Sequence, residues 1–288
     1  MPRKNIFELL QEKYDIDEEM EKITALFFGK LFSFTNHLNI HQEILSIEDI
    51  IEKILFRSSL PVFVRWKQRG SCLNCDEMRK KLRIPRTKSL DDKIVTLEYI
   101  LNIIDLFQKY VDISPTSNFV CSPKYALLLQ NITLLLDHLN YEEHYFEDEE
   151  KAILIPKNPA ATAVAELSSE DTAFAILMYH HGSLKGQIEA KKDILRRIAK
   201  EYEALLDKGI NGFSDYFEKA RGLLNNLDIR HNNRSGKNKN PLIESLSAEE
   251  LEKWYDKLYQ LLLFCVLIED NIKRKNDVAE FLKELRKE

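Results

Sequence analysis

The sequence predicts a mainly α protein, on three observations. Its 288 residues include only 8 glycines and 8 prolines, so few positions would interrupt a helix. Apolar residues recur at steps of three, four and seven residues along most of the chain, which is the spacing of one helix face. A single segment, 143–156, instead has two short runs around an acidic turn and ends in prolines, which predicts one small β-hairpin.

The N-terminal region is predicted to be helical, beginning with residues 3–58. Ser46 and Asp49 form an S-x-x-D helix start, and isoleucines follow it at helical spacing. Residues 60–66 are compatible with either a short strand or a buried turn of helix. The polar, basic segment 67–92 predicts an exposed connection that carries a short helix. Further helices are expected at about 92–111 and 125–139.

The C-terminal region is also predicted to be helical, from Ser169 onward. Its apolar stripes have helical spacing and contain Leu184, Ile188, Leu195, Ile198, Tyr202 and Leu205, then Phe213, Phe217, Ala220, Leu224 and Leu227. Ser247 and Glu250 form a capping box for a helix from 248 to about 270, and a polar helix is expected at 273–287. Two regions follow: a helical N-terminal region with the hairpin, residues 1–160, and a C-terminal helical bundle, residues 161–288.

Composition and charge limit the functions that the chain can have. With 44% hydrophobic and 31% charged residues, it has the composition of a globular protein rather than a disordered one. Its net charge of −5 gives no overall attraction to nucleic acids, so any RNA contact requires a local basic patch. Four cysteines without a disulfide framework, acidic residues where a signal peptide needs an apolar core, and a longest apolar run of only 261–268 predict a soluble, cytoplasmic protein without membrane contact.

The segment 223–240, LLNNLDIRHNNRSGKNKN, carries the strongest chemical signal in the chain. Asp228, Arg230 and His231 can hold or move protons and bind anions, and the neighbouring asparagines add directional hydrogen bonds. Residues 229–240 include four cations and no carboxylate, which predicts a site that favours phosphate. The alternative is a polar helix cap, in which an asparagine and a cation satisfy the last carbonyls and the helix dipole.

Arg230 and His231 are the candidate reacting pair. A guanidinium binds phosphate through two hydrogen bonds or stabilises charge that develops on it, and an imidazole takes or gives a proton near neutral pH. In RNA cleavage such a pair would activate a 2′-hydroxyl or protonate the leaving oxygen without a metal. Adjacent helical residues point about 100° apart, so these two side chains can share a face only where the helix has ended.

An apolar helix that ends in Arg-His, followed by a polar loop and a long apolar helix, resembles the HEPN superfamily (higher eukaryote and prokaryote nucleotide-binding domain). The resemblance covers residues 184–272, and it implies a helical bundle, often dimeric, that acts as a metal-independent ribonuclease in toxin–antitoxin, abortive-infection or other phage-defence systems. In the family motif an Arg is usually followed by Asn or His and then by a later His. Arg230 and His231 match the first two positions, and no His follows His231 in this chain.

Two hypotheses follow from the residues and the resemblance. In the first, the protein is an effector that acts on RNA, with Arg230 stabilising the phosphate and His231 as general acid or base. The other polar residues of the loop would then orient the RNA or follow its backbone: Asn232, Asn233, Arg234, Lys237 and Lys239. In the second, a non-catalytic helical module uses the same surface to bind a nucleotide or a partner protein.

The helix expected at Leu251–Ile268 bears on the partners. It is apolar on nearly all faces and is therefore predicted to be buried on all sides, either in a homodimer or against the N-terminal region of its own chain. The resemblance adds RNA or a nucleotide, and a partner protein of a defence system. The chain has no Walker A, GxGxxG, HExxH, GxSxG or EF-hand pattern, so no cofactor or metal is expected.

Cys72 and Cys75 form a CxxC, which is half of a zinc site or a redox pair in other proteins. The only further candidate ligands are His37 and His41, so two reduced thiols in an exposed loop are the simpler interpretation. Two more groups fit structural roles: His180–His181 as a helix cap and Glu142–Glu150 as a solvated strand edge.

Overall fold

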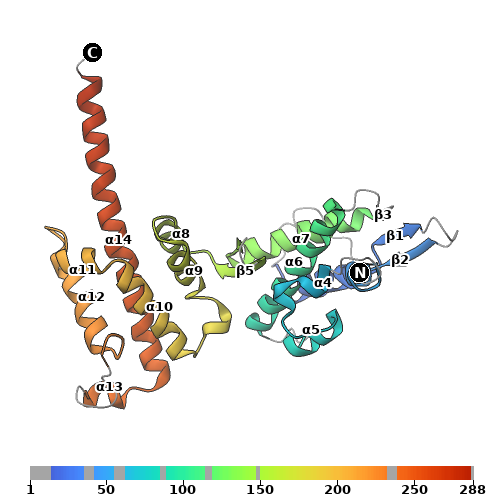
Figure 1. Cartoon of the computed structure of the whole chain (residues 1–288), viewed down its shortest axis with the longest axis horizontal. Helices are drawn as coiled ribbons and strands as arrows, with labels where there is room; N and C mark the ends of the chain where they lie inside the picture. Colours follow the sequence, from blue (N-terminus) through green and yellow to red (C-terminus); the bar gives the residue numbers. More distant parts are fainter. Residues whose placement is uncertain are drawn as a thin grey trace, which may run out of the picture. The chain divides into compact units, whose positions relative to one another are not determined.

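The computed structural model describes residues 14–35, 42–54, 62–84, 89–113, 119–146, 150–231 and 239–286. The chain divides into two compact units, residues 1–156 and 157–288, close to the boundary expected at residue 160 (Figure 1). Helices dominate both units, so the predicted mainly α class is confirmed.

The N-terminal unit is built around the long helix α6 (Leu90–Ile113). The other helical segments of this unit are α2 (Ile16–Phe27), α3 (Ile47–Asp49), the π-helical turn η1 (Ile50–Ile54), α4 (Val62–Arg65), the 3₁₀ turn η3 (Lys67–Arg69), α5 (Cys75–Leu82) and α7 (Pro123–Leu139). The predicted start signal is confirmed, because Ser46 and Asp49 exchange both capping-box hydrogen bonds. Within the segment 60–66, which is compatible with a strand or a turn of helix, residues 62–65 form the short helix α4.

A three-stranded antiparallel sheet in this unit corrects the helical prediction for residues 3–58 and the expectation of a single hairpin. Its order is β2 (Gln42–Leu45), β1 (Phe32–Thr35), β3 (Phe119–Cys121). In its register, Phe32 faces Leu45 on one side and Cys121 on the other. The strands are three or four residues long, too short to be recognised from local alternation, and β3 pairs with a strand far away in the sequence.

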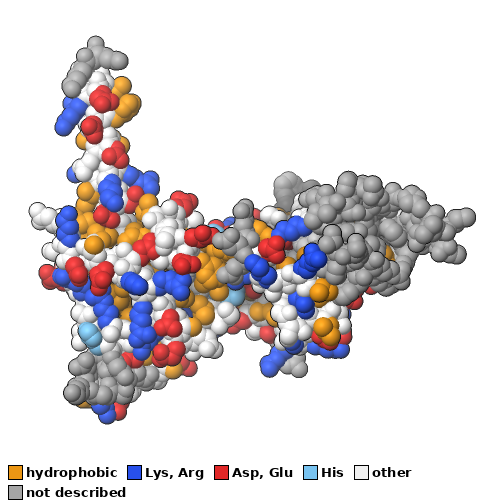
Figure 2. All heavy atoms as spheres, viewed as in Figure 1, with side chains coloured by type: hydrophobic (Ala, Val, Ile, Leu, Met, Phe, Trp, Pro, Cys, Tyr) orange, Lys and Arg blue, Asp and Glu red, His pale blue; other side chains and the backbone are white. Residues whose placement is uncertain are grey.

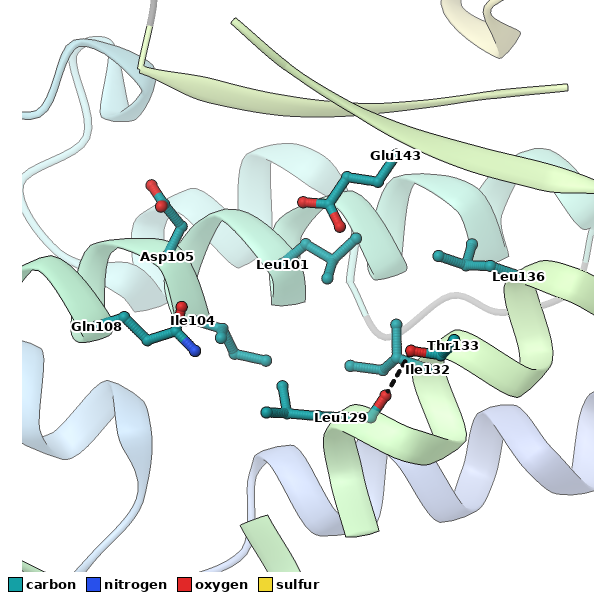
Figure 3. Close-up of a pocket in the computed structure, with 9 residues that line it drawn as sticks. All are labelled: Leu101, Ile104, Asp105, Gln108, Leu129, Ile132, Thr133, Leu136 and Glu143. Carbon is teal, nitrogen blue, oxygen red and sulfur yellow. Dashed lines mark hydrogen bonds between the residues drawn. The ribbon is translucent and has the colours of Figure 1, made fainter. Parts of the chain in front are cut away.

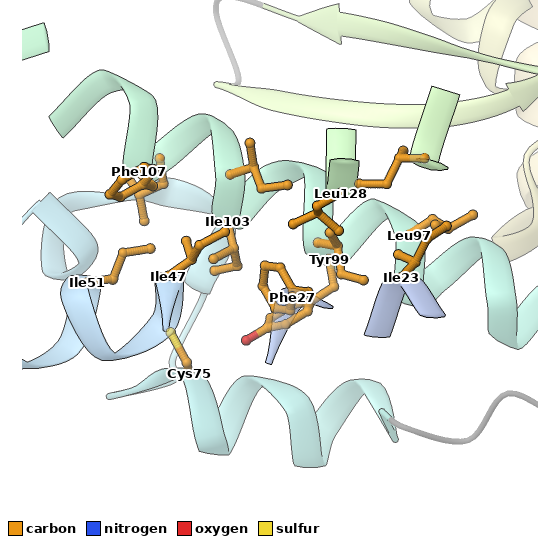
Figure 4. Packing of buried hydrophobic residues seen from close by; sticks show 14 of the residues in the cluster. Ile23, Phe27, Ile47, Ile51, Cys75, Leu97, Tyr99, Ile103, Phe107 and Leu128 are labelled. Atoms are coloured by element: carbon orange, nitrogen blue, oxygen red, sulfur yellow. The ribbon is translucent and has the colours of Figure 1, made fainter. Parts of the chain in front are cut away.

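The core of the N-terminal unit forms where α6 meets α2, α3 and α7. Figure 4 shows Phe27, Tyr99, Ile103 and Leu128 directed toward one another from three helices. The rings of Phe27 and Tyr99 pack edge to face with their centroids 6.1 Å apart. Each of these side chains is buried, so the core fixes α6 in position relative to the elements around it.

The predicted hairpin is confirmed as β4 (Tyr141–Phe146) paired antiparallel with β5 (Lys151–Pro156). Strand β5 packs on α6, and polar side chains of that helix complete its backbone hydrogen bonds. Asn102 accepts from the Ala152 N–H at 2.9 Å and donates to the Ala152 carbonyl at 2.8 Å. Glu98 accepts from the Leu154 N–H at 2.8 Å. The helix therefore covers an edge that would otherwise expose unpaired backbone groups.

The C-terminal unit is a helical bundle around α14 (Ala248–Leu285). The other helical segments are α8 (Pro159–Glu166), α9 (Glu170–Met178), the 3₁₀ turn η4 (Gly182–Leu184), α10 (Ile188–Glu201), α11 (Glu203–Lys208), α12 (Ser214–Asn226) and α13 (Pro241–Ser245). The Ser247–Glu250 capping box is confirmed. The two helices expected at 248–270 and 273–287 are instead one helix of 38 residues, because no glycine or proline interrupts the segment.

The apolar part of α14 is covered by its own unit. Helices α8, α10 and α12 pack against it and bury Tyr255, Leu258 and Leu262, whereas Trp254 and Phe264 stay partly exposed. The expectation that Leu251–Ile268 is buried on all sides is therefore correct for most of its faces and wrong for the face that carries Trp254 and Phe264. Beyond it, α14 extends past the other helices of its unit (Figure 1), and residues 273–286 are all exposed.

Candidate functional site

The candidate site lies where α12 ends, and its sequence explains why the helix stops there. Phe217, Ala220 and Leu224 form the buried face of α12, and Leu227 closes its last turn by donating to the Leu223 carbonyl at 2.8 Å. Asp228 follows in the left-handed region, with φ of 62°, a conformation that aspartate tolerates better than most residues. This reversal ends the helix before Arg230 and His231, so helical geometry no longer forces their side chains about 100° apart.

Two cations of α10 hold this turn in place. Lys192 donates to the Asp228 carboxylate at 2.6 Å, and the two side chains are 9% and 6% exposed. One helical turn later, the Nε atom of Arg196 donates to the Ile229 carbonyl at 2.5 Å. If either partner of this ion pair moved away, the other charge would be left buried without a partner. The ion pair therefore stabilises the turn.

The guanidinium of Arg230 is the least satisfied group at the turn. Its side chain is 24% exposed, and its Nη2 atom lies 3.6 Å from Glu203 Oε1 at the start of α11, which is longer than a hydrogen bond. That Nη2 atom is buried and has no hydrogen-bond partner among the described residues. A buried donor without an acceptor costs free energy, and the rest of the guanidinium is partly exposed, so an anion that approached it would meet a charge that Glu203 compensates only loosely.

His231 follows Arg230 outside the helix and is exposed. It makes no hydrogen bond with any residue in the described ranges, so no carboxylate or carbonyl there fixes its ring orientation or tautomer. Neither side chain caps the helix. The cap interpretation instead applies to Asp228 and to the Arg230 backbone N–H, which donates to the Leu224 carbonyl at 3.0 Å.

Most of the predicted basic loop lies outside the described residues: Asn232, Asn233, Arg234 and Lys237. Lys239 lies where the chain becomes described again, and its ammonium pairs with Glu244 at 2.6 Å, both side chains being 49% exposed. An exposed ion pair of this kind is worth little and yields readily to a competing phosphate. Figure 2 shows basic side chains on the visible face of the C-terminal unit mixed with acidic ones, without a continuous basic patch on that face.

The residues that sequence reasoning missed at this site are Lys192, Arg196 and Glu203. They precede Arg230 by 27 to 38 positions, and only the packing of α10 and α11 beside the end of α12 brings them together. The sequence did contain a local signal, because Lys192 and Arg196 stand four residues apart on an amphipathic helix, with Leu195 and Ile198 on its buried face.

The CxxC prediction needs a correction. Cys72 and Cys75 are 4% and 1% exposed, so they are not thiols in an exposed loop. Cys75 is the first residue of α5, its N–H donates to Glu52 at 2.6 Å, and burial raises the pKa of its thiol. The candidate ligands His37 and His41 lie outside the described residues. Within the described ranges, no three His, Cys, Asp or Glu side chains are grouped as metal ligands.

The two remaining candidates have structural partners. His181 accepts from the Ser183 N–H at 3.2 Å and so begins η4, which makes it a cap after α9 rather than at its last residue. His180 contacts the ring of Tyr259 with centroids 5.1 Å apart, and burial lowers its pKa. In the acidic hairpin, Glu142 pairs with His144 at 3.0 Å.

In the part of the chain that the structure describes, no helix is both long and apolar enough to span a membrane. Comparisons with models of protein families, with curated proteins and with solved structures find no match to this chain.

Proposed function

We propose that the C-terminal unit acts on RNA as a metal-independent endoribonuclease, in a phage-defence or toxin–antitoxin setting in the cytoplasm. One observation carries the proposal: Arg230 presents a buried guanidinium donor without a hydrogen-bond partner, beside an exposed imidazole and at the start of a basic loop. A bidentate guanidinium and a neighbouring general acid or base are the groups that phosphodiester cleavage needs.

The reaction uses the RNA itself as nucleophile. A base takes the proton of a 2′-hydroxyl, the 2′-oxygen bonds to the adjacent phosphorus, and the P–O5′ bond breaks as an acid protonates the 5′-oxygen. The products are a 2′,3′-cyclic phosphate and a 5′-hydroxyl. Arg230 would stabilise the extra negative charge on the phosphoryl oxygens in the transition state, and His231 would supply one of the two proton transfers.

The test is incubation of the pure protein with labelled RNA in EDTA. The wild type should cut, and Arg230→Ala should lower the rate by about 10²–10³-fold while keeping much of the binding, because the guanidinium acts chiefly in the transition state. Arg274→Ala is the matched control, since Arg274 also pairs with a carboxylate, Asp270, at 2.6 Å on an exposed helix surface. Equal activity of Arg230→Ala and wild type would refute the proposal.

The second candidate is a non-catalytic module that binds a nucleotide or a partner protein of a defence system on the same surface. It is favoured by His231, whose ring has no orienting partner in the described ranges, whereas a catalytic base is ordinarily held by a third group. Fluorescence anisotropy with RNA that carries a 2′-deoxy substitution separates the candidates. Binding with no cleavage of the matched all-ribose RNA would favour the module.

The proposal includes a homodimer, and the outer part of α14 supports it. Val278, Phe281, Leu282 and Leu285 are 46–59% exposed and stand at the i, i+3, i+4, i+7 spacing of one helix face. A second copy would cover this apolar stripe, and an unsupported helical end of this length is marginal in water. Light scattering should give twice the mass of one chain, and Phe281→Glu with Leu285→Glu should halve it. Lys283→Glu, which changes a neighbouring exposed residue, should not.

A further inference from the structure

A half-enclosed cavity of about 260 Å³ lies in the N-terminal unit between α6, α7 and β4 (Figure 3). Five of its nine lining residues are apolar and together form the apolar wall: Leu101, Ile104, Leu129, Ile132 and Leu136. Its polar side chains are Asp105, Gln108, Thr133 and Glu143. Pockets for drug-sized ligands measure roughly 300–1,000 Å³, so this cavity fits a molecule somewhat smaller than those.

The charges at the cavity are unbalanced. Asp105 pairs with Lys109 at 3.0 Å, and the Lys109 ammonium also donates to the Tyr145 hydroxyl. Glu143 projects from β4 over the apolar wall toward Leu101 (Figure 3), and it forms no hydrogen bond or ion pair with a described residue. Two carboxylates therefore line the cavity, and Lys109, which does not line it, pairs with Asp105 alone, so the charge of Glu143 has no cation partner among the described residues.

The environment of Glu143 indicates the same need. Although water reaches its carboxylate through the open side of the cavity, the surrounding protein and the charge of Asp105 raise its pKa. A carboxylate in such a place is less stable ionised than in bulk water. A cation bound between Glu143 and Asp105 would therefore lower the free energy of both groups.

We propose that this cavity binds a small amphipathic amine, with its ammonium between Glu143 and Asp105 and its carbon chain on the leucine and isoleucine wall. An ammonium supplies up to three donors to the carboxylates, and the chain removes apolar wall surface from water. An anion would be repelled. A calcium site is ordinarily built from several carboxylates that converge on the ion, and no three His, Cys, Asp or Glu side chains are grouped as metal ligands in the described ranges. The site lies in a different unit from Arg230 and is independent of RNA cleavage.

The first test follows methyl NMR signals of the full chain during titration with hexylamine, hexan-1-ol and hexanoate. Hexylamine should shift the methyl signals of Leu101, Ile104 and Leu129. The affinity for hexanol should be weaker than that for hexylamine by about tenfold or more, and hexanoate should not bind. Equal affinity for hexylamine and hexanol, or no shift with hexylamine, would overturn the proposal. Nα-acetyl-lysinamide is the second probe, and tighter binding of it would assign the ammonium to a protein lysine instead of a free amine.

The second test uses variants. Glu143→Gln keeps the shape of the side chain and should weaken hexylamine binding by about tenfold or more, because it removes a charge-assisted hydrogen bond. Glu142→Gln is the matched control, since the neighbouring carboxylate pairs with His144 at 3.0 Å and does not line the cavity. Thr133→Lys should abolish binding by placing an ammonium of the chain itself at the site. Unchanged affinity in Glu143→Gln would refute the assignment.

Discussion

Each unit of this protein contains a buried carboxylate that pairs with a cation. The surroundings of the two ion pairs differ in whether a buried polar group is left without a hydrogen bond. In the N-terminal unit, Glu48 accepts from both Arg79 and the Tyr99 hydroxyl, so the cluster is satisfied within the fold. In the C-terminal unit, Lys192 satisfies Asp228, but the turn that they hold carries Arg230, whose buried Nη2 atom lies near Glu203 without a hydrogen bond. A buried charge by itself is therefore weak support for a site, whereas an unsatisfied donor beside one is stronger support.

The largest effect that tests this comparison is expected on the free energy of unfolding of the N-terminal unit, when the Glu48 carboxylate is removed. Glu48→Ala leaves the Tyr99 hydroxyl buried without its acceptor and removes a partner of Arg79, which should destabilise that unit by about 3 kcal/mol. Hydrogen exchange of α6 amides measures the loss separately from the other unit. Asp76→Ala removes an exposed partner of Arg79 and of Lys80 and should cost less than about 1 kcal/mol. RNA binding should be unchanged in both variants.

In the C-terminal unit, Asp228→Asn should affect stability and function together. Asparagine tolerates the positive φ at this position but removes the charge that neutralises buried Lys192, so the unit should lose about 1.5–3 kcal/mol. RNA cleavage should slow as well, because the turn that positions Arg230 loosens. Asp215→Asn, which breaks an exposed pair with Lys219, is the control and should change neither. A wild-type cleavage rate in Asp228→Asn would show that the turn does not position the site.

A smaller effect is expected at the far end of the basic loop. Lys239→Ala should weaken RNA binding modestly and reduce the slope of log K against log salt by about 0.7, the value for one phosphate contact on a single strand. Glu244→Gln should do the opposite, because it frees Lys239 from its ion pair and lets the ammonium contact RNA. Filter binding between about 50 and 200 mM salt measures both slopes. If both variants weaken binding, the ion pair itself shapes the surface.

The contrast between the units also shows what the sequence could predict. Local signals predicted local structure: Ser46 and Ser247 begin helices through capping boxes, and the hairpin forms where the alternating runs lie. In the sheet, β1 and β2 were missed because each has only four residues, and β3 was missed because it pairs with residues about 90 positions away, which no local pattern records.

The same distinction between local patterns and long-range contacts applies to the candidate site. Its helix end, and the position of Arg230 and His231 beyond that end, could be predicted from the sequence of α12. The groups that hold the turn could not, since Lys192 and Arg196 reach it only through tertiary packing of α10. The cysteines show the reverse error: a polar sequence around Cys72 and Cys75 suggested exposure, but the core buries both.

Acid should destabilise the C-terminal unit through His180. Burial is the main cause that lowers its pKa from 6.5 in the folded state, and Lys191 adds to it against the opposing charge of Asp256. The unfolded chain therefore binds the proton more tightly, so the stabilising contribution is complete above pH 6.5 and is lost as the pH falls below it. His180→Gln should flatten this part of the profile when α14 hydrogen exchange is followed from pH 7.5 to 5. An unchanged slope would mean that folding does not lower the pKa of His180.

The smallest expected effect has the opposite sign and belongs to the N-terminal unit. Although water reaches the Glu143 carboxylate on one side, the surrounding protein and then Asp105 raise its pKa from 4.5 in the folded state, so the folded unit binds this proton more tightly than the unfolded chain does. Its stabilising contribution is present below the unfolded pKa and is lost as the pH rises through the folded one. Glu143→Gln should remove this loss and leave the N-terminal unit slightly more stable near neutral pH, as hydrogen exchange of α7 amides would show. Saturating hexylamine should stabilise the wild-type unit at that pH but not the variant, since the ammonium compensates the same carboxylate. If Glu143→Gln lowers stability at neutral pH, then the carboxylate is already compensated within the fold and the cavity has no need of a cation.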